Sequence, residues 1–141
     1  MEQDRTRADA IAEGSIQIPV NDAMGFVYDS KTAEEIVFTY EIRPEHCNSA
    51  GGIHGGTLAA FADSILGGAA ALHLPPERYP ALAEMKISIF RPASAGMKLT
   101  GTGRILKAGR RVLFAEAEIT DPDGTLIAKA SGTEIPADVP S

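Results

Sequence analysis

Residues 56–74, GTLAAFADSILGGAAALHL, decide the fold, because they form the one long stretch of this chain with helical periodicity. At about 100° per residue, the large apolar side chains of this stretch fall on one side and predict a helix that packs on a sheet. The side chains on this packing side are Leu58, Phe61, Ile65 and Leu72. Pro75 and Pro76 then end the helix, because proline cannot continue it.

Asp63 points away from the packing side of this helix, and no other charged residue lies between Gly55 and Leu74. Its neighbours on the same face are mostly small: Gly56, Ala59, Ala60, Leu66, Gly67 and Ala70. A solvent-facing helix surface usually carries Lys, Glu, Arg or Gln. The small residues around a lone carboxylate therefore indicate that another subunit or a ligand comes close to Asp63. The alternative is an exposed aspartate on an alanine-rich helix.

Strand-like segments lie on both sides of the helix and predict an α+β layout with one antiparallel sheet. They are residues 26–28 and 35–42 before the helix, and 83–89, 97–106, 111–120 and 125–135 after it. The turn sequence Asp121-Pro122-Asp123-Gly124 separates the last two. Residues 3–13 predict a short helix with frayed ends. No linker or repeat divides residues 1–141, so we expect a single domain.

A glycine-rich segment, NSAGGIHGG at residues 48–56, leads directly into the helix. Glycines let a ligand approach the backbone, and the first turn of a helix has N–H groups without intrahelical acceptors. Such donors bind a phosphate or the oxyanion that develops in acyl transfer. The segment matches neither the P-loop nor the dinucleotide-binding glycine pattern. A flexible turn that caps the helix, with Gly55 at positive φ, explains the composition equally well.

Composition excludes several classes of function. The net charge of −6 and the absence of Trp argue against nucleic-acid binding. No apolar run is long enough for a membrane span, and the first residues form no signal sequence. Cys47 is the single cysteine, which fits a reducing cytoplasm and makes an intrachain disulfide impossible. The spacing of His46, His54 and His73 favours no metal site, and we expect no cofactor.

Together these residues resemble the hotdog-fold acyl-CoA thioesterases of the phenylacetate-degradation and 4-hydroxybenzoyl-CoA type, from about Phe38 to Thr133. The most specific part is residues 48–64, NSAGGIHGGTLAAFADS, where the family has Asn, five residues, His-Gly-Gly and then an acidic residue on the helix. Residues 87–93, ISIFRPA, and 124–128, GTLIA, also match family segments.

The resemblance implies a sheet wrapped around one long central helix, with homodimers that assemble into homotetramers and an active site at the dimer interface. It implies that the Gly55 N–H polarises the thioester carbonyl and that Asn48 orients the acyl group or the water. Asp63, from the partner subunit, would act as general base or as nucleophile.

Other residues are candidates for contacts to an acyl-CoA substrate. His54, Gly56 and Ser64 belong to the matching motif, although His54 between glycines is more typical of a structural hydrogen-bonding residue than of an acid or base. Arg91 and Arg110 are candidates for binding the phosphates of coenzyme A. One departure from the family is the segment Ala81-Leu82-Ala83, where several relatives place a Ser or Thr that holds the nucleophilic water.

These patterns predict hydrolysis of an acyl-CoA thioester to free acid and coenzyme A. An alternative from another class is an acyl-CoA-binding or regulatory module without catalysis. A third candidate, a hotdog dehydratase or hydratase, needs a His paired with a carboxylate, and no such pair is found. The acyl group is not readable from the sequence, because aromatic, medium-chain and short acyl groups all fit pockets of this kind.

Overall fold

The computed structural model describes residues 4–140 and has the predicted order of two strands, one long helix and four strands. The strands are β1 (Phe26–Lys31), β2 (Glu35–Glu41), β3 (Arg78–Ile89), β4 (Lys98–Ala108), β5 (Leu113–Thr120) and β6 (Leu126–Asp138). The long helix is α3 (Gly55–Ala71), and a 3-10 turn at Pro44–His46 precedes it. This α+β architecture confirms the predicted fold class.

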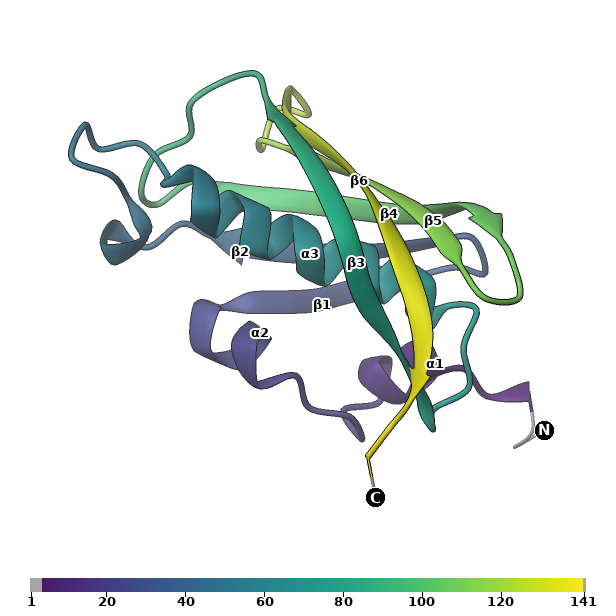
Figure 1. The fold of residues 1–141 in the computed structure, drawn as a ribbon. Helices are drawn as coiled ribbons and strands as arrows, with labels where there is room; N and C mark the ends of the chain where they lie inside the picture. The colour runs from purple at the N-terminus through teal and green to yellow at the C-terminus, as the bar shows by residue number, and fades with distance from the viewer. Residues whose placement is uncertain (1–3, 141) are drawn as a thin grey trace.

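All neighbouring strands pair antiparallel in one six-stranded sheet with the order β1-β2-β4-β5-β6-β3. The sheet curls around α3, which crosses its inner face (Figure 1). Alternate residues of β2, Ile36, Phe38 and Tyr40, are buried against the helix. The backbones approach closely at Gly103 of β4, where an added Cβ would lie 2.7 Å from the carbonyl oxygen of Ile65.

Helix α3 begins one residue earlier than predicted and ends about three residues sooner. The early end has a local cause. Pro75 disfavours helical geometry at the residue before it, so the chain turns between Leu72 and Leu74 and then enters β3. The four large apolar residues of the predicted packing side, Leu58, Phe61, Ile65 and Leu72, are all buried as expected.

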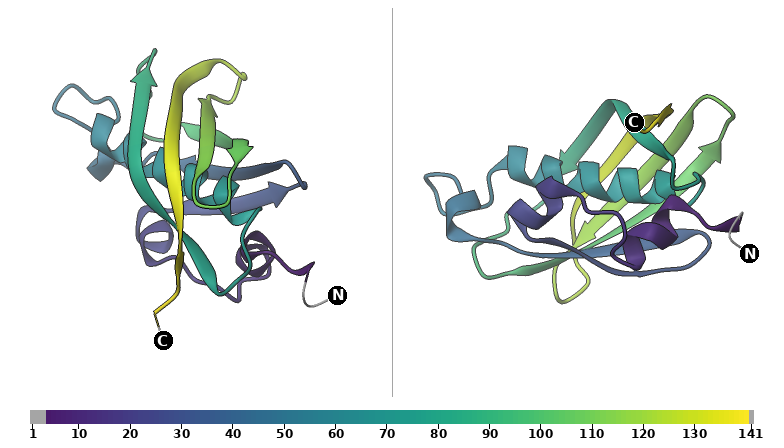
Figure 2. Two further views of the ribbon diagram at one scale, coloured as in Figure 1. Left: turned by 45° about the vertical axis from the view of Figure 1, so that its right-hand side comes forward. Right: turned by 90° about the horizontal axis from the view of Figure 1, so that it is seen from below.

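The N-terminal segment lies alongside α3 on the side that the sheet leaves open (Figure 2, right). It contains α1 (Arg7–Ala12) and α2 (Pro19–Met24). The first confirms the core of the helix predicted at 3–13, of which residue 3 lies outside the described part. The second was not predicted, because six residues are too few for a clear helical period. Pro19 at its start and Gly25 at its end, with φ of +81°, are its only sequence signals.

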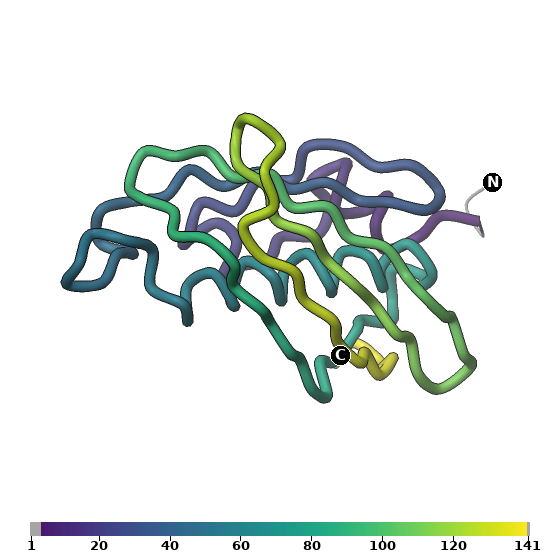
Figure 3. Tube along the Cα trace, turned by 90° about the horizontal axis from the view of Figure 1, so that it is seen from above, coloured from purple at the N-terminus to yellow at the C-terminus, as the bar shows by residue number. Residues whose placement is uncertain are grey.

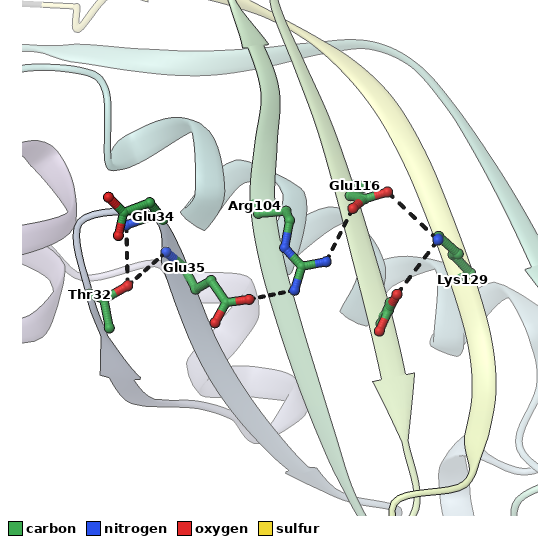
Figure 4. Close-up of polar contacts among 7 residues, drawn as sticks. Thr32, Glu34, Glu35, Arg104, Glu116 and Lys129 are labelled. Carbon is green, nitrogen blue, oxygen red and sulfur yellow. Dashed lines mark hydrogen bonds and ion pairs between the residues drawn. The ribbon is translucent and has the colours of Figure 1, made fainter.

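The outer face of the sheet carries a chain of ion pairs across four strands (Figure 4). Arg104 on β4 pairs with Glu35 on β2 and, at 3.1 Å, with Glu116 on β5. Lys129 on β6 extends the network to Glu116 and Glu118. These charges face away from α3, so this network is separate from the surroundings of Asp63. Among the described helices, none is long and apolar enough to cross a membrane.

Candidate active site

Asp63 lies near the middle of α3 on the side of the helix that the sheet does not cover, and it is exposed in the single chain. Within residues 4–140, no hydrogen bond or ion pair engages its carboxylate. The protein around one side of the carboxyl removes part of its water, and this desolvation raises its pKa above the usual range. A carboxylate of this kind is available to accept a proton or to attack an electrophile.

A cavity of about 240 Å³ opens beside Asp63, between α3, the N-terminal segment and the start of β3. Ser64 lines it and donates a hydrogen bond from its hydroxyl to Oδ1 of Asn21 at 2.6 Å. Asn21 is buried and comes from α2, so the unpredicted helix contributes directly to the surroundings of Asp63. No signal in the sequence marked Asn21, because its helix itself was not recognised.

A second carboxyl, Glu134 on β6, lies on the inner face of the sheet and is only 1% exposed. Its cross-strand neighbours are Leu82 and Leu113, and neither carboxyl oxygen has a hydrogen-bond partner within the described chain. Burial, with a smaller contribution from the nearby charge of Asp63, raises the pKa of Glu134 to about 7. Alternation with the inward-facing Ala130 and Gly132 could have identified Glu134 from the sequence.

The N-terminus of α3 presents one backbone donor that the protein leaves without an acceptor. Nδ1 of His54 accepts a hydrogen bond from the Gly56 N–H at 3.0 Å and thereby caps the helix. The carbonyl of His54 accepts from Thr57 and Leu58. No acceptor within residues 4–140 pairs with the Gly55 N–H, and Gly55 is exposed and has no positive φ. The alternative that Gly55 is needed for a left-handed backbone is therefore wrong.

Asn48 lies in the loop before α3 and its side chain folds back on that loop. Its Oδ1 accepts hydrogen bonds from Ala50 N–H at 2.9 Å and Gly52 N–H at 3.2 Å. Because the carbonyl oxygen is occupied, the group that Asn48 has left for a ligand is the Nδ2 amide, which only donates. A carbonyl oxygen of a substrate would suit this donor, as it would suit the Gly55 N–H.

Arg91 and Arg110, the two candidates for binding the phosphates of coenzyme A, lie far apart within one chain. Arg91 follows β3 near the loop that enters α3, and its Nη1 donates to the Leu126 carbonyl at 2.7 Å. Arg110 lies in the β4–β5 hairpin. These loops are at opposite ends of the molecule (Figure 3). Arg104, a third basic residue on these strands, is engaged in the outer ion-pair network.

One prediction about the face around Asp63 is wrong. Leu66 and Ala70 were placed on the open side of α3, but both are fully buried. The cause is the curl of the sheet: β3 and β6 wrap around the helix, and an added Cβ on Gly132 of β6 would lie 3.0 Å from Leu66. Ala59, Ala60 and Gly67 do remain partly exposed, so the open face is narrower than predicted.

The described residues offer neither a cluster of metal-binding side chains nor, at residues 81–83, a hydroxyl that could hold a water. In the described part of the chain, no three His, Cys, Asp or Glu side chains are close enough to hold a metal ion. Ala81, Leu82 and Ala83 lie in β3 and offer no hydroxyl, as the sequence indicated. The hydroxyls that line the cavity are those of Ser64 and Tyr79.

The family model of the thioesterase superfamily matches residues 50–128, which include the end of the loop before α3, the whole of α3 and most of the sheet. The chain belongs to this superfamily. It is accordingly a thioester hydrolase, and a carboxylate beside a cavity with an unpaired backbone N–H at the start of the same helix fits that chemistry.

Individual relatives agree with the family assignment. Acyl-coenzyme A thioesterase 13 from Mus musculus is 31% identical over 107 residues, which cover 74% of this chain and 75% of that protein. The phenylacetic acid degradation-related protein of Ralstonia eutropha has a TM-score of 0.84 and 26% identity over 92% of this chain and 98% of its own. The phenylacetic acid degradation protein of Thermus thermophilus has a TM-score of 0.76 and 27% identity over 84% and 98%. These matches confirm the hotdog thioesterase resemblance.

Proposed function

We propose that the protein hydrolyses acyl-CoA thioesters to a free acid and coenzyme A, with Asp63 as the catalytic carboxylate. The observation that carries the proposal is the unpaired Asp63 carboxylate beside the cavity, on a helix whose first N–H, that of Gly55, is also unpaired. The name of the mouse relative supports coenzyme A as the leaving group. We take the chain as one hotdog domain that acts in the cytoplasm.

Asp63 and Gly55 are eight positions apart on α3, which corresponds to about 12 Å along the helix axis. A thioester held by the Gly55 N–H at hydrogen-bond distance is therefore out of reach of Asp63 in the same chain, because reacting atoms must lie about 3–3.5 Å apart. The proposal therefore requires two chains. Gly55 of one subunit and Asp63 of a second subunit would face each other across a homodimer interface.

The surface around Asp63 suits such an interface. Ala59, Ala60 and Gly67 are partly exposed, and their small side chains allow a second α3 helix to approach closely. A two-fold dimer with antiparallel helices would bring each Asp63 towards the other subunit's Gly55 and would form two equivalent sites. We further propose that these dimers assemble into a homotetramer, as the family resemblance implies.

In this site the Gly55 N–H and Nδ2 of Asn48 would donate hydrogen bonds to the thioester carbonyl oxygen and stabilise the negative charge that develops there. In the general-base route, Asp63 removes a proton from water, the water oxygen attacks the carbonyl carbon, and the C–S bond breaks to release the thiolate of coenzyme A. In the nucleophilic route, a carboxylate oxygen of Asp63 attacks the carbonyl carbon and the C–S bond breaks to release the thiolate of coenzyme A. Water then hydrolyses the resulting mixed anhydride to the free acid and regenerates the Asp63 carboxylate. The same residues serve both routes.

The remaining candidates have supporting roles in the proposal. His54 fixes the helix start by accepting a hydrogen bond from the Gly56 N–H. Ser64 holds Asn21 and so shapes the cavity beside Asp63. Arg91, close to the loop that enters α3, is the better placed of the two arginines to bind a coenzyme A phosphate, and Arg110 would serve a site in another subunit of the assembly.

The experiment that tests the proposal is thiol release from a panel of acyl-CoAs by the wild type and by Asp63→Asn. Loss of a positioned base or nucleophile should lower turnover by at least about 10²-fold, while circular dichroism shows an unchanged fold. Ser131→Ala, on the exposed outer face of β6, is the control and should keep full activity. Binding of acyl-CoA without thiol release by the wild type would instead favour the non-catalytic binding module.

A further inference from the structure

The cavity beside Asp63 is elongated along α3. Asp63 and Ala71 both line it, and eight positions separate them, so it extends about 12 Å along the helix. Ile11, Ile18, Gly67 and Pro80 give it largely apolar walls. An acyl group whose carbonyl carbon lies at Asp63 would therefore have an apolar channel ahead of it, directed towards the C-terminal end of α3.

The far end of this channel carries a positive charge. Arg7 of α1 lines the cavity, and its position beside the end of α3 is fixed by two hydrogen bonds. Its backbone N–H donates to the carbonyl of Leu74, and Nη1 donates to the carbonyl of Pro76, both at 2.7 Å. Tyr79, at the start of β3, lines the same cavity. The channel thus has a carboxylate at the reacting end and a guanidinium at the other.

The charge of Arg7 has no carboxylate partner within residues 4–140. Two acidic side chains of the same segment form ion pairs elsewhere, Asp9 with Lys31 and Glu13 with Arg5. Partial burial lowers the pKa of the Arg7 guanidinium, which still remains protonated at neutral pH. A partly buried cation without a counter-charge is costly, and an anionic group that enters the channel would offset this cost through charge-assisted hydrogen bonds.

We propose that this channel selects acyl groups with an anionic far end, so that the preferred substrates are coenzyme A thioesters of dicarboxylic acids. The carbonyl would lie at Asp63, the methylene chain along the apolar walls, and the terminal carboxylate on Arg7. With about 3 Å left at each end for contacts, a channel of about 12 Å takes a chain of roughly five to seven carbons. The inference rests on the proposed function, since it assigns the acyl part of the same substrate.

The test compares two substrates that differ only at the far end. Adipyl-CoA ends in a carboxylate, and hexanoyl-CoA has a methyl group in its place on a chain of the same length. Both are assayed by thiol release with the wild type, with Arg7→Met, which keeps the apolar stem but removes the charge, and with Arg5→Met as a matched control outside the cavity lining. We expect the wild type to prefer adipyl-CoA in kcat/KM. Arg7→Met should reduce that preference by about 10- to 100-fold, the value of a charge-assisted hydrogen bond, with hexanoyl-CoA hydrolysis preserved.

Each other outcome overturns a defined part of the account. Equal losses for both substrates in Arg7→Met would mean that Arg7 binds coenzyme A itself or only supports the fold, and the selectivity proposal would be wrong. A wild type that hydrolyses hexanoyl-CoA but rejects adipyl-CoA would also refute it while leaving the proposed hydrolase intact. No thiol release from either substrate, or from any acyl-CoA of the panel, would refute the proposed function and the inference with it.

Discussion

Replacing Glu134 by Gln should change how the stability of the protein depends on pH. The pKa of Glu134 rises from 4.5 in the unfolded chain to about 7 in the fold, because the side chain is buried between Leu82 and Leu113 and close to the charge of Asp63. The folded state therefore holds a proton that the unfolded state releases between these two pH values. The contribution of Glu134 to the free energy of unfolding is therefore complete below pH 4.5 and is lost as the pH rises through about 7.

The magnitude follows from the shift. At 1.36 kcal/mol per pKa unit, a rise from 4.5 to about 7 corresponds to roughly 3 kcal/mol of unfolding free energy lost between acidic and mildly alkaline pH. Glutamine has nearly the same shape and cannot ionise. Its buried amide also lacks partners, so the absolute stability of the variant is not informative and the pH slope is the quantity to compare.

Urea unfolding at fixed protein concentration, from pH 4.5 to pH 8.5, measures this slope. The free energy of unfolding of the wild type should fall relative to that of Glu134→Gln by about 3 kcal/mol over this range. Glu45→Gln, which removes an exposed carboxyl, is the matched control and should follow the wild type. Parallel curves for wild type and Glu134→Gln would refute the assignment of a buried, protonated carboxyl beside Asp63.

Two further predictions concern the site and its assembly. Gly55→Ala should lower turnover by about 10²- to 10³-fold, the cost of losing an oxyanion donor, because the added Cβ would crowd the thioester carbonyl or shift the N–H. The melting temperature should stay nearly unchanged, because the added Cβ meets only Ile89 Cδ1 at 3.5 Å and the backbone needs no positive φ. A destabilised enzyme with full activity would contradict this. Light scattering at micromolar concentration should report a mass at least twice that of the 14.8 kDa chain, because the small-residue face around Asp63 requires a partner subunit. A monomer would exclude an active site shared between two subunits.

The sequence was sufficient for most of the fold because its signals are local. The helical period of α3, the prolines after it and the strong turn at Asp121–Gly124 each depend on a few adjacent residues, and the structure confirms all of them. Helix α2 was missed because six residues do not make a period. Leu66 and Ala70 were misplaced because the extent to which a sheet curls around a helix depends on long-range pairing of β3 with β6.

The site residues likewise fall into those that a local motif predicts and those that only the folded chain brings together. Asp63, Asn48 and Gly55 stand in one continuous motif, so their association with a helix start and its exposed face could be predicted from spacing alone. Asn21, Arg7 and Glu134 come from the two ends of the chain, and their position beside α3 depends on how the termini pack. The cavity, which Asn21 and Arg7 line, could therefore be found only in the folded chain.

The central claim is that each site combines Gly55 of one subunit with Asp63 of another, and subunit complementation tests it most directly. Asp63→Asn and Gly55→Ala chains with different tags are co-expressed, and the assemblies that carry both tags are purified and assayed for acyl-CoA hydrolysis. A mixed dimer with two-fold symmetry has one site with both defects and one with neither. We therefore predict about half the wild-type activity for each mixed dimer, and for the doubly tagged assemblies an activity far above that of either inactive parent. Mixed dimers as inactive as their parents would contradict the shared site.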